Sequence, residues 1–411
     1  MKNKSISAMI VGAASLGVSI IAFAQTSSPV KPQYEIPGGD KVNEDAPRGI
    51  ALADGVAFYP AVELGVGRDD NLFVSNSNKK SSTFGTLRPG FKFQARSANA
   101  IYTVDFDANS TQYQDSSDDN FNDRNIRGSA DFIVTSSMGF RLNGDYNRGH
   151  DPRGSTDRGF SSRPDVFINN GPSAIFAYGA NDAAGRIELE GGTFRKSYEN
   201  NFATTAASKR DTTNYAGRFF MRIAPKTSLL LEARNEKFDY ASPTSLQDSK
   251  EQRLLVGVTW DATAATSGTV KAGRIKKDFS SPTLKDFSGT GWEAAIAWTP
   301  MTYSKFDFYT NKSFSESTGF GDFTLTKRYG AAWTHAWNSR FSTIANISRA
   351  DDEFATTSRN DSTDSLGLKV VYKLMRGVQV GGEYNYVDRD SSISTFRYKR
   401  NIFLLTLGAT L

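Results

Sequence analysis

A hydrophobic period of two residues runs from Val56 to Leu411 and leaves few folds open to this chain. Apolar or aromatic residues occupy one parity and polar or charged residues the other, in about eighteen segments of about 10 to 15 residues, which is the pattern of β-strands. In the last segment, for example, Phe403, Leu405 and Leu407 share one face. The predicted strands are 57–67, 83–95, 99–113, 122–135, 138–149, 165–178, 185–198, 211–224, 227–239, 250–261, 267–279, 287–299, 302–315, 323–337, 340–354, 362–374, 377–389 and 395–411.

The connectors between these strands alternate in length. Short ones follow every second strand, at 135–138, 224–227, 298–302, 337–340 and 374–377. The others are longer and rich in Asp, Ser, Asn and Gly, at 68–82, 114–123, 149–164, 199–211 and 351–361. Short periplasmic turns that alternate with long outer loops are typical of an outer-membrane barrel, whereas a soluble sandwich or propeller gives no reason for this sorting.

The fold predicted is therefore an all-β, transmembrane, antiparallel up-and-down β-barrel of about eighteen strands, with both termini periplasmic. In hydrocarbon each unpaired backbone group costs several kcal/mol, so a sheet crosses only as a closed cylinder. The apolar parity then faces lipid and lipopolysaccharide, and the polar parity faces the lumen. Aromatic residues near the strand ends predict two interfacial girdles. The loop-side girdle would hold Tyr113, Phe121, Tyr198, Phe202, Phe238, Tyr240, Phe279, Phe314, Phe320, Phe323, Phe354 and Phe396, and the turn-side girdle Trp260, Trp298, Tyr303, Trp337 and Phe341.

The N-terminal residues have the pattern of a targeting signal. Lys2 and Lys4 precede an apolar stretch of about 15 residues that ends at Ala22-Phe23-Ala24, the pattern of a cleaved secretory signal peptide. Residues 25–55 are rich in Pro, Gly and charge, which indicates a flexible periplasmic segment. The predicted organisation is a signal peptide (1–24), this segment (25–55) and a barrel (56–411) in the outer membrane of a Gram-negative bacterium.

The polar parity predicts the lining of the lumen. Its charges are mixed in sign, which favours a water-filled interior without sharp ion selectivity and with many cross-strand ion pairs. The predicted pore-lining residues are Glu63, Lys92, Asp105, Asp107, Arg127, Asp131, Arg141, Asp145, Glu188, Glu190, Arg218, Arg222, Glu232, Arg234, Arg253, Glu293, Lys305, Asp307, Lys369 and Glu383, and Lys196, Glu236 and Lys271 share their parity.

Little in the chain suggests catalysis, a metal or a cofactor. It has no Cys and 2 His, and its formal net charge of +5 is spread along the length, so neither a metal centre nor a nucleic-acid partner is expected. His150, near Asp151 and Ser155, could belong to a hydrolase site, and His335 is the other candidate, but a non-enzymatic protein is predicted. The acidic pairs Asp69-Asp70, Asp118-Asp119 and Asp351-Asp352 lack calcium-loop spacing, so solvated loops are expected there.

Two features resemble a known family. The first strand, FYPAVELGVGRDDNLF (58–73), ends in an Asp-Asp-Asn turn, and strands ending in an aromatic residue, an acidic loop and a basic re-entry recur, as in GEYNYVDRDSSISTFRYKRNIFLL. Over most of the mature chain this resembles the putative β-barrel porin type 2 family, outer-membrane barrels associated with exopolysaccharide or capsule biosynthesis operons. The resemblance implies export of a polysaccharide through the barrel, with a periplasmic export component as a further partner. One departure is the final Leu411, where many bacterial barrels end in an aromatic residue.

Two other functions remain open from the sequence. One is a general diffusion porin for small solutes, expected to be a trimer, which a long inward-folded loop across the pore would favour. The other is a barrel hydrolase, which loss of hydrolysis on replacing His150 or Ser155 would favour. Glycosyltransferase genes beside this one would favour polysaccharide export.

Overall fold

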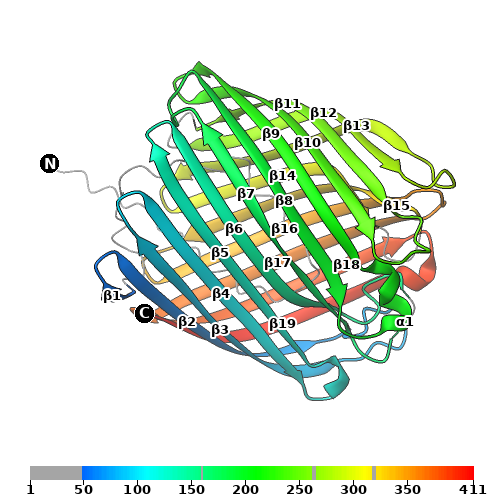
Figure 1. Ribbon diagram of the computed structural model, residues 1–411. Coiled ribbons are helices and arrows are strands. Elements are labelled where there is room, and N and C mark those ends of the chain that lie inside the picture. Colours follow the sequence, from blue (N-terminus) through cyan, green and yellow to red (C-terminus); the bar gives the residue numbers. More distant parts are fainter. Residues whose placement is uncertain (1–48, 159–160, 262–264, 317–320) are drawn as a thin grey trace.

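The computed structural model describes residues 49–158, 161–261, 265–316 and 321–411, so the predicted signal peptide and most of the 25–55 segment lie outside the described residues. One antiparallel sheet rolls into a barrel whose strands are tilted to its axis (Figure 1). Each strand pairs with the next in sequence, and β19 pairs with β2 to close the cylinder. The first nine barrel strands are β2 (Val56–Asp69), β3 (Ser82–Arg96), β4 (Ala100–Tyr113), β5 (Phe121–Thr135), β6 (Met138–Asp151), β7 (Asp165–Tyr178), β8 (Gly185–Tyr198), β9 (Arg210–Ala224) and β10 (Thr227–Tyr240). The others are β11 (Ser249–Trp260), β12 (Thr266–Phe279), β13 (Phe287–Met301), β14 (Ser304–Glu316), β15 (Phe323–Ala336), β16 (Phe341–Phe354), β17 (Asn360–Met375), β18 (Val378–Ser391) and β19 (Tyr398–Thr410).

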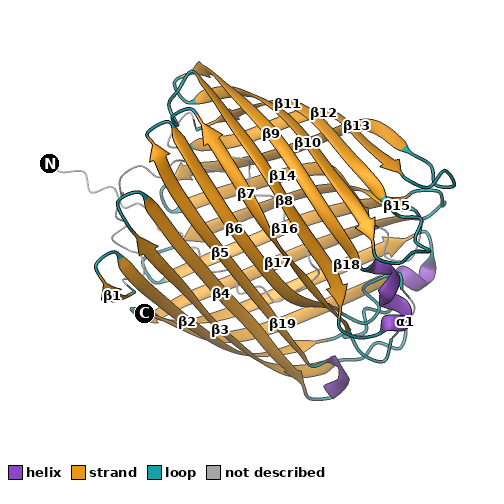
Figure 2. Cartoon of the chain, viewed as in Figure 1, coloured by secondary structure: helices purple, strands orange, loops and turns teal. Residues whose placement is uncertain are grey.

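The two ends of the barrel differ. At the turn end, where β2 begins and β19 finishes, short turns join the strands. The loop end carries the longer connectors and the short helices of the described residues, which are η1 (Ser117–Asp119), α1 (Phe202–Thr205), η2 (Ala206–Ser208) and η3 (Ser394–Phe396) (Figure 2). No helix among the described residues is long and apolar enough to cross a membrane. Within the segment expected to be flexible, Ile50–Ala53 forms β1, which pairs with the start of β2 at the turn end.

The two faces of the wall have opposite chemistry, as the period of two predicts. Large apolar side chains are exposed on the outside, among them Leu64, Val256 and Leu405. Charged side chains such as Glu232 and Lys271 are buried on the inside. The register keeps these parities aligned from strand to strand, because directly opposed residues of an antiparallel pair share a face. The prediction of an apolar outer and a polar inner surface is therefore confirmed.

The Asp-Asp-Asn turn after β2 fastens the closing strands together. Asp69, fully buried, forms an ion pair with Arg400 of β19. Asp70 Oδ1 accepts a hydrogen bond from the Asn401 backbone N–H at 2.7 Å, and Asn71 Nδ2 donates to the Lys399 carbonyl at 2.9 Å. The last residue of the first barrel strand is thus tied to the last strand where the β2–β19 register ends, at Asp69 and Ile402.

A second seam, between β13 and β14, is closed differently. Their register ends at Glu293 and Asn311, although β13 begins at Phe287 and β14 continues to Glu316. Beyond that point Phe314 and Phe323, which have the lipid-facing parity, are buried against inward-facing Ile275 and Phe287. The Phe287 and Phe314 ring centroids are 5.4 Å apart. The end of the β14–β15 hairpin therefore lies inside the edge of β13, and an apolar contact, which we call the lap, replaces the missing backbone pairs.

The predicted loop-side girdle is wrong for most of its members. Tyr113, Phe121, Tyr198, Phe238, Tyr240, Phe279 and Phe354 have the inward parity, and Phe314 and Phe323 lie in the lap. Phe396 packs against Arg359, Phe202 is exposed on the loops, and Phe320 lies outside the described residues. Cations lie over many of these inward rings, such as Arg359 over Phe354 at 4.1 Å, which gives them a reason to face inward. At the turn end, by contrast, Trp298, Tyr303 and Trp337 are exposed as predicted.

Candidate permeation pathway

The most extensive feature of the inner wall is a continuous network of ion pairs across β8–β13, which we call the wall network. Arg218 contacts Glu190 and Glu232, each at 2.8 Å. Lys271 continues the network, at 2.9 Å from Glu232 and 2.8 Å from Glu293. Its members are Arg186, Glu188, Glu190, Arg218, Glu232, Arg234, Glu251, Arg253, Lys271, Lys277 and Glu293.

Burial explains why these charges are paired. Glu188, Glu232 and Lys277 are fully buried, and an unpaired charge there would cost several kcal/mol. Every member lies within 4.0 Å of a member of opposite charge, even though Arg234 and Arg253 are directly opposite each other in the register. The network therefore stiffens the wall and gives the interior surface charges of both signs.

All twenty predicted pore-lining residues lie on the inward parity of the wall, as the register requires. Outside the wall network, several form ion pairs: Glu63 with Arg88, Asp107 with Arg127, Asp131 with Arg141, Lys305 with Asp307 and Lys369 with Glu383. Among the described residues, Lys92, Asp105, Asp145 and Arg222 form no ion pair. Whether these side chains meet a solute stays a prediction.

A chain of ion pairs crosses the mouth of the barrel at the loop end. Arg359, in the β16–β17 loop, donates from Nη1 to Asp157 Oδ1 of the β6–β7 loop at 2.8 Å. Arg359 also pairs with Asp361 of β17 at 2.6 Å. The next residue after Asp157, Arg158, pairs back to Asp151 of β6 at 2.6 Å and to Asp165 of β7 at 2.9 Å.

This mouth bridge, made of Asp151, Asp157, Arg158, Asp165, Arg359 and Asp361, joins walls that are far apart around the circumference. Strands β18, β19 and β2–β5 lie on one side of it and β8–β15 on the other. The side chains of Asp157 and Arg359 are 3% and 1% exposed. Burial alone would lower the pKa of Arg359, but hydrogen bonds to Asp361 and Asp157 and their charges raise it above its ordinary value, so the bridge keeps its cation.

The segment that carries the bridge, residues 152–158, fills the mouth on the β2–β5 side. Arg153 pairs with Asp119 of η1 and lies 4.1 Å from the centre of the Phe73 ring in the β2–β3 loop. Gly154 has φ +76° and approaches Phe73 so closely that a Cβ would lie 2.3 Å from its carbonyl oxygen. Only glycine fits at this crossing.

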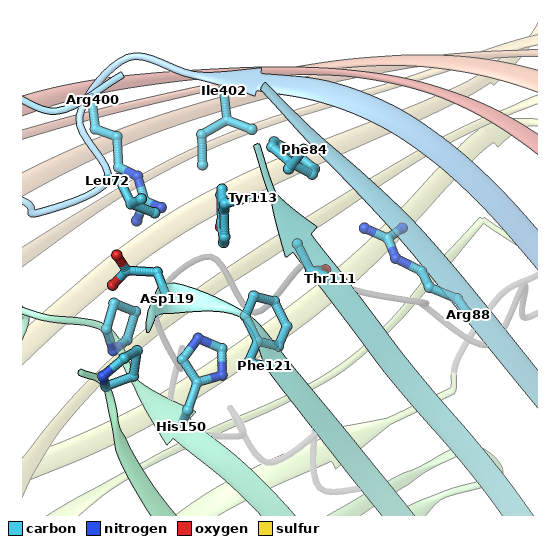
Figure 3. A pocket seen from close by; sticks show the side chains of 12 residues that line it. Leu72, Phe84, Arg88, Thr111, Tyr113, Asp119, Phe121, His150, Arg400 and Ile402 are labelled. Atoms are coloured by element: carbon cyan, nitrogen blue, oxygen red, sulfur yellow. The ribbon is translucent and has the colours of Figure 1, made fainter. Parts of the chain in front are cut away.

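Beneath this segment is a pocket lined by side chains from several strands (Figure 3). Arg88 and Thr111 line it from the wall, Arg400 and Asp119 from the loop end, and Tyr113 and Phe121 lie between them. The pocket is a small recess at the loop end, lined by β3–β6, β19 and the adjoining loops.

The candidate catalytic residues do not form a site. His150 stacks on Phe121, and its Nδ1 lies 3.0 Å from Asp123, whereas Asp151 is held by Arg158. Ser155 donates to the Pro152 carbonyl at 2.7 Å rather than to His150. His335 lies at the turn end among Tyr303, Trp333 and Trp337.

The acidic pairs are also used within the fold. Asp119 binds Arg153, Asp351 binds Arg349, and Asp352 accepts a hydrogen bond from Thr326 at 2.6 Å. Among the described residues no three His, Cys, Asp or Glu side chains are arranged to hold a metal ion. The expectation that these three acidic pairs are simply solvated loop residues is wrong for Asp69 and Asp119, which are buried in ion pairs.

Sequence reasoning missed the bridge residues Asp157, Arg158 and Arg359. Asp157 and Arg359 are 202 residues apart and lie in loops without periodicity, so no spacing relates them. The only available signal was the density of Arg and Asp in HDPRGSTDR (150–158), which fits a solvated loop equally well.

Comparison with known proteins agrees with this architecture. No curated protein sequence matches the chain. Among solved structures, Pseudomonas aeruginosa OccK2 (OpdF) in complex with glucuronate is 10% identical with a TM-score of 0.50, over 87% of this chain and 99% of that one. Acinetobacter baumannii OccAB2 is 10% identical with a TM-score of 0.48, over 87% and 98%. These likenesses concern the fold alone. The family model described as putative beta-barrel porin 2 matches residues 49–410, so the chain belongs to that family of outer-membrane β-barrel porins.

Proposed function

We propose that this protein is a channel for the passive diffusion of small hydrophilic solutes across the outer membrane. The observation that carries the proposal is the mouth bridge, the contact of Asp157 with Arg359 across the opening. A loop folded across the mouth narrows an aqueous barrel of this strand number, which would otherwise be wide. It thereby limits passage by size.

Export of a polysaccharide, which the family resemblance implied, has less support. A polymer would have to thread past residues 152–158, which contact loops on several sides of the mouth. Release of that segment would break buried ion pairs, among them those of Asp119 and Asp157. A monosaccharide or ion needs no such release.

In this proposal the loop end faces the cell exterior, and the turn end, where β2 begins and β19 finishes, faces the periplasm. A solute enters beside the mouth bridge and moves along the β8–β15 wall. The wall network offers neighbouring charges of both signs, already neutralised by one another, so each contact with a solute is weak and brief. Weak contacts allow exit as well as entry, which conduction requires.

The test uses the purified, folded full chain in planar bilayers and in liposomes. We expect stepwise KCl conductance, and liposome swelling that is faster with a monosaccharide than with a hexasaccharide. The heat-unfolded protein serves as the control. The absence of conductance by correctly folded protein would overturn the proposal. Swelling that is equally fast with long glycans would instead favour polysaccharide export.

A further inference from the structure

We propose that the inner wall of β7–β10, near the loop end, binds the carboxylate of a small, ring-shaped organic acid through Lys196 and Arg210. This inference rests on the proposed function and deepens it, because it names a class of solute that the channel recognises.

The first observation is two neighbouring cations. Lys196 of β8 and Arg210 of β9 are directly opposite each other in the register and both have the inward parity. Opposed side chains on adjacent strands start about 5 Å apart, a separation that a single carboxylate can bridge. Like charges at this spacing repel each other, so an anion between them is favoured.

The second observation is that neither cation has an anionic partner. Among the described residues Lys196 and Arg210 form no ion pair, unlike the buried cations of the wall network. The Arg210 Nε is buried and has no hydrogen-bond acceptor. The nearby carboxylates of Asp151 and Asp165 both bind Arg158. A guanidinium donates most strongly to a planar carboxylate, so the lack of an anionic partner for these two cations indicates the chemistry of a solute that would bind them.

The third observation is the aromatic surface around the two cations. Lys196 Nζ lies 4.5 Å from the Phe167 ring centre and 5.3 Å from that of Tyr198. Arg210 lies 5.9 Å from the centre of Phe238 and 5.8 Å from that of Tyr240. Tyr198 and Phe238 are buried, whereas Phe167 and Tyr240 are half-buried and offer ring surface to the C–H face of a solute ring.

Neutral polar groups on the neighbouring strands flank the two cations. Asn169 of β7 is directly opposite Lys196, and Tyr240 of β10 is directly opposite Arg210. The Asn169 side chain is exposed on the inward parity. An amide, an ammonium, a guanidinium and a phenol therefore follow one another around the wall, a pattern that matches a carboxylate next to hydroxyl groups. A hexuronate has this chemistry, and the corresponding neutral hexose lacks the carboxylate.

The test measures the KCl current of the full chain in planar bilayers while galacturonate or galactose is added. We expect galacturonate to reduce the current in a saturable manner and galactose, which is matched in size, to have little effect. In the double variant Lys196→Gln, Arg210→Gln, the half-inhibitory galacturonate concentration should rise about tenfold or more, because charge-assisted hydrogen bonds are lost.

The control variant is Arg195→Gln. Arg195 neighbours Lys196 on β8 but has the outward parity, is exposed, and pairs with Asp211. Arg195→Gln should leave the galacturonate response unchanged. Lys196→Arg, which keeps the positive charge, should also retain this response. Heat-modifiable gel mobility confirms that each variant is folded.

Each remaining outcome overturns one specific claim. If galacturonate acts no differently from galactose on a conducting wild-type channel, or if the double variant responds like the wild type, the binding site is refuted while the channel stands. If the folded protein does not conduct at all, the proposed function itself is refuted.

Discussion

Replacement of Asp157 by Asn should loosen the mouth bridge without changing the shape of the side chain at the contact. The change removes the charge that faces Arg359 across the opening, at a Nη1 to Oδ1 distance of 2.8 Å. Arg359 keeps its pair with Asp361, so the variant leaves no unpaired buried cation. The effect on the fold should therefore be confined to the loop end.

The magnitude follows from the burial of the pair. Both side chains are almost completely buried, so salt screens their interaction weakly. A hydrogen bond to a charged group contributes about 1.5–3 kcal/mol, and a loss of about 2 kcal/mol raises the ratio of released to seated loop about thirtyfold. A segment released for about one part in a hundred of the time would then be released for roughly a quarter of it.

Single-channel recording resolves such a change. The wild type should show one dominant conductance level, and Asp157→Asn should visit a second, larger level for a substantial fraction of the time. Liposome swelling should shift towards larger sugars. Asp118→Ala is the control, because Asp118 is an exposed residue of η1 beside the buried Asp119. Identical conductance histograms and size limits in wild type and Asp157→Asn would refute the claim that the bridge narrows the mouth.

Three further substitutions test the wall itself. Phe314→Ala removes a central ring of the lap and should lower the free energy of unfolding by about 3–5 kcal/mol, measured by urea titration of the heat-modifiable gel band. Phe308→Ala, on the exposed outer face of the same strand, should lower it by less. Arg400→Ala leaves the fully buried Asp69 without its cation and should lower the free energy of unfolding by about 3–5 kcal/mol in the same assay. The control is Arg68→Ala, at an exposed position of β2. Equal stability of the two variants would contradict the closure described for β2 and β19. Leu405→Arg places a charge on the outer face and should lower stability by about 2–4 kcal/mol in bilayers, a cost that would be absent if this face were not in lipid.

The strands were predictable because their signal is local. A period of two residues, repeated along each strand, places every strand of the barrel to within a few residues and also assigns the two faces of the wall. Glu232 and Lys271, for example, have the inward parity in the sequence and are buried on the inside in the structure. The four-residue strand β1 was missed because IALA is too short to show the period.

The loop end was not predictable in the same way. Parity alone does not reveal that Phe314 folds over the inner face of Phe287, because this depends on where the β13–β14 register stops. Aromatic residues near strand ends suggested a lipid interface, yet Tyr198 and Phe238 face inward, where cations lie over their rings. The mouth bridge depends on a contact between distant loops, and the sequence carries no periodic trace of it.

The central claim is that one wall separates lipid on its outer face from water within, and cysteine labelling tests it directly because the native chain has no Cys. Asp307 and Phe308 are consecutive residues of β14, the first with the inward parity and 40% side-chain exposure, the second exposed on the outer face. In outer-membrane vesicles a small, charged thiol reagent should modify Asp307→Cys rapidly and Phe308→Cys hardly at all. Equal modification of the two, or faster modification of Phe308→Cys, would contradict the account.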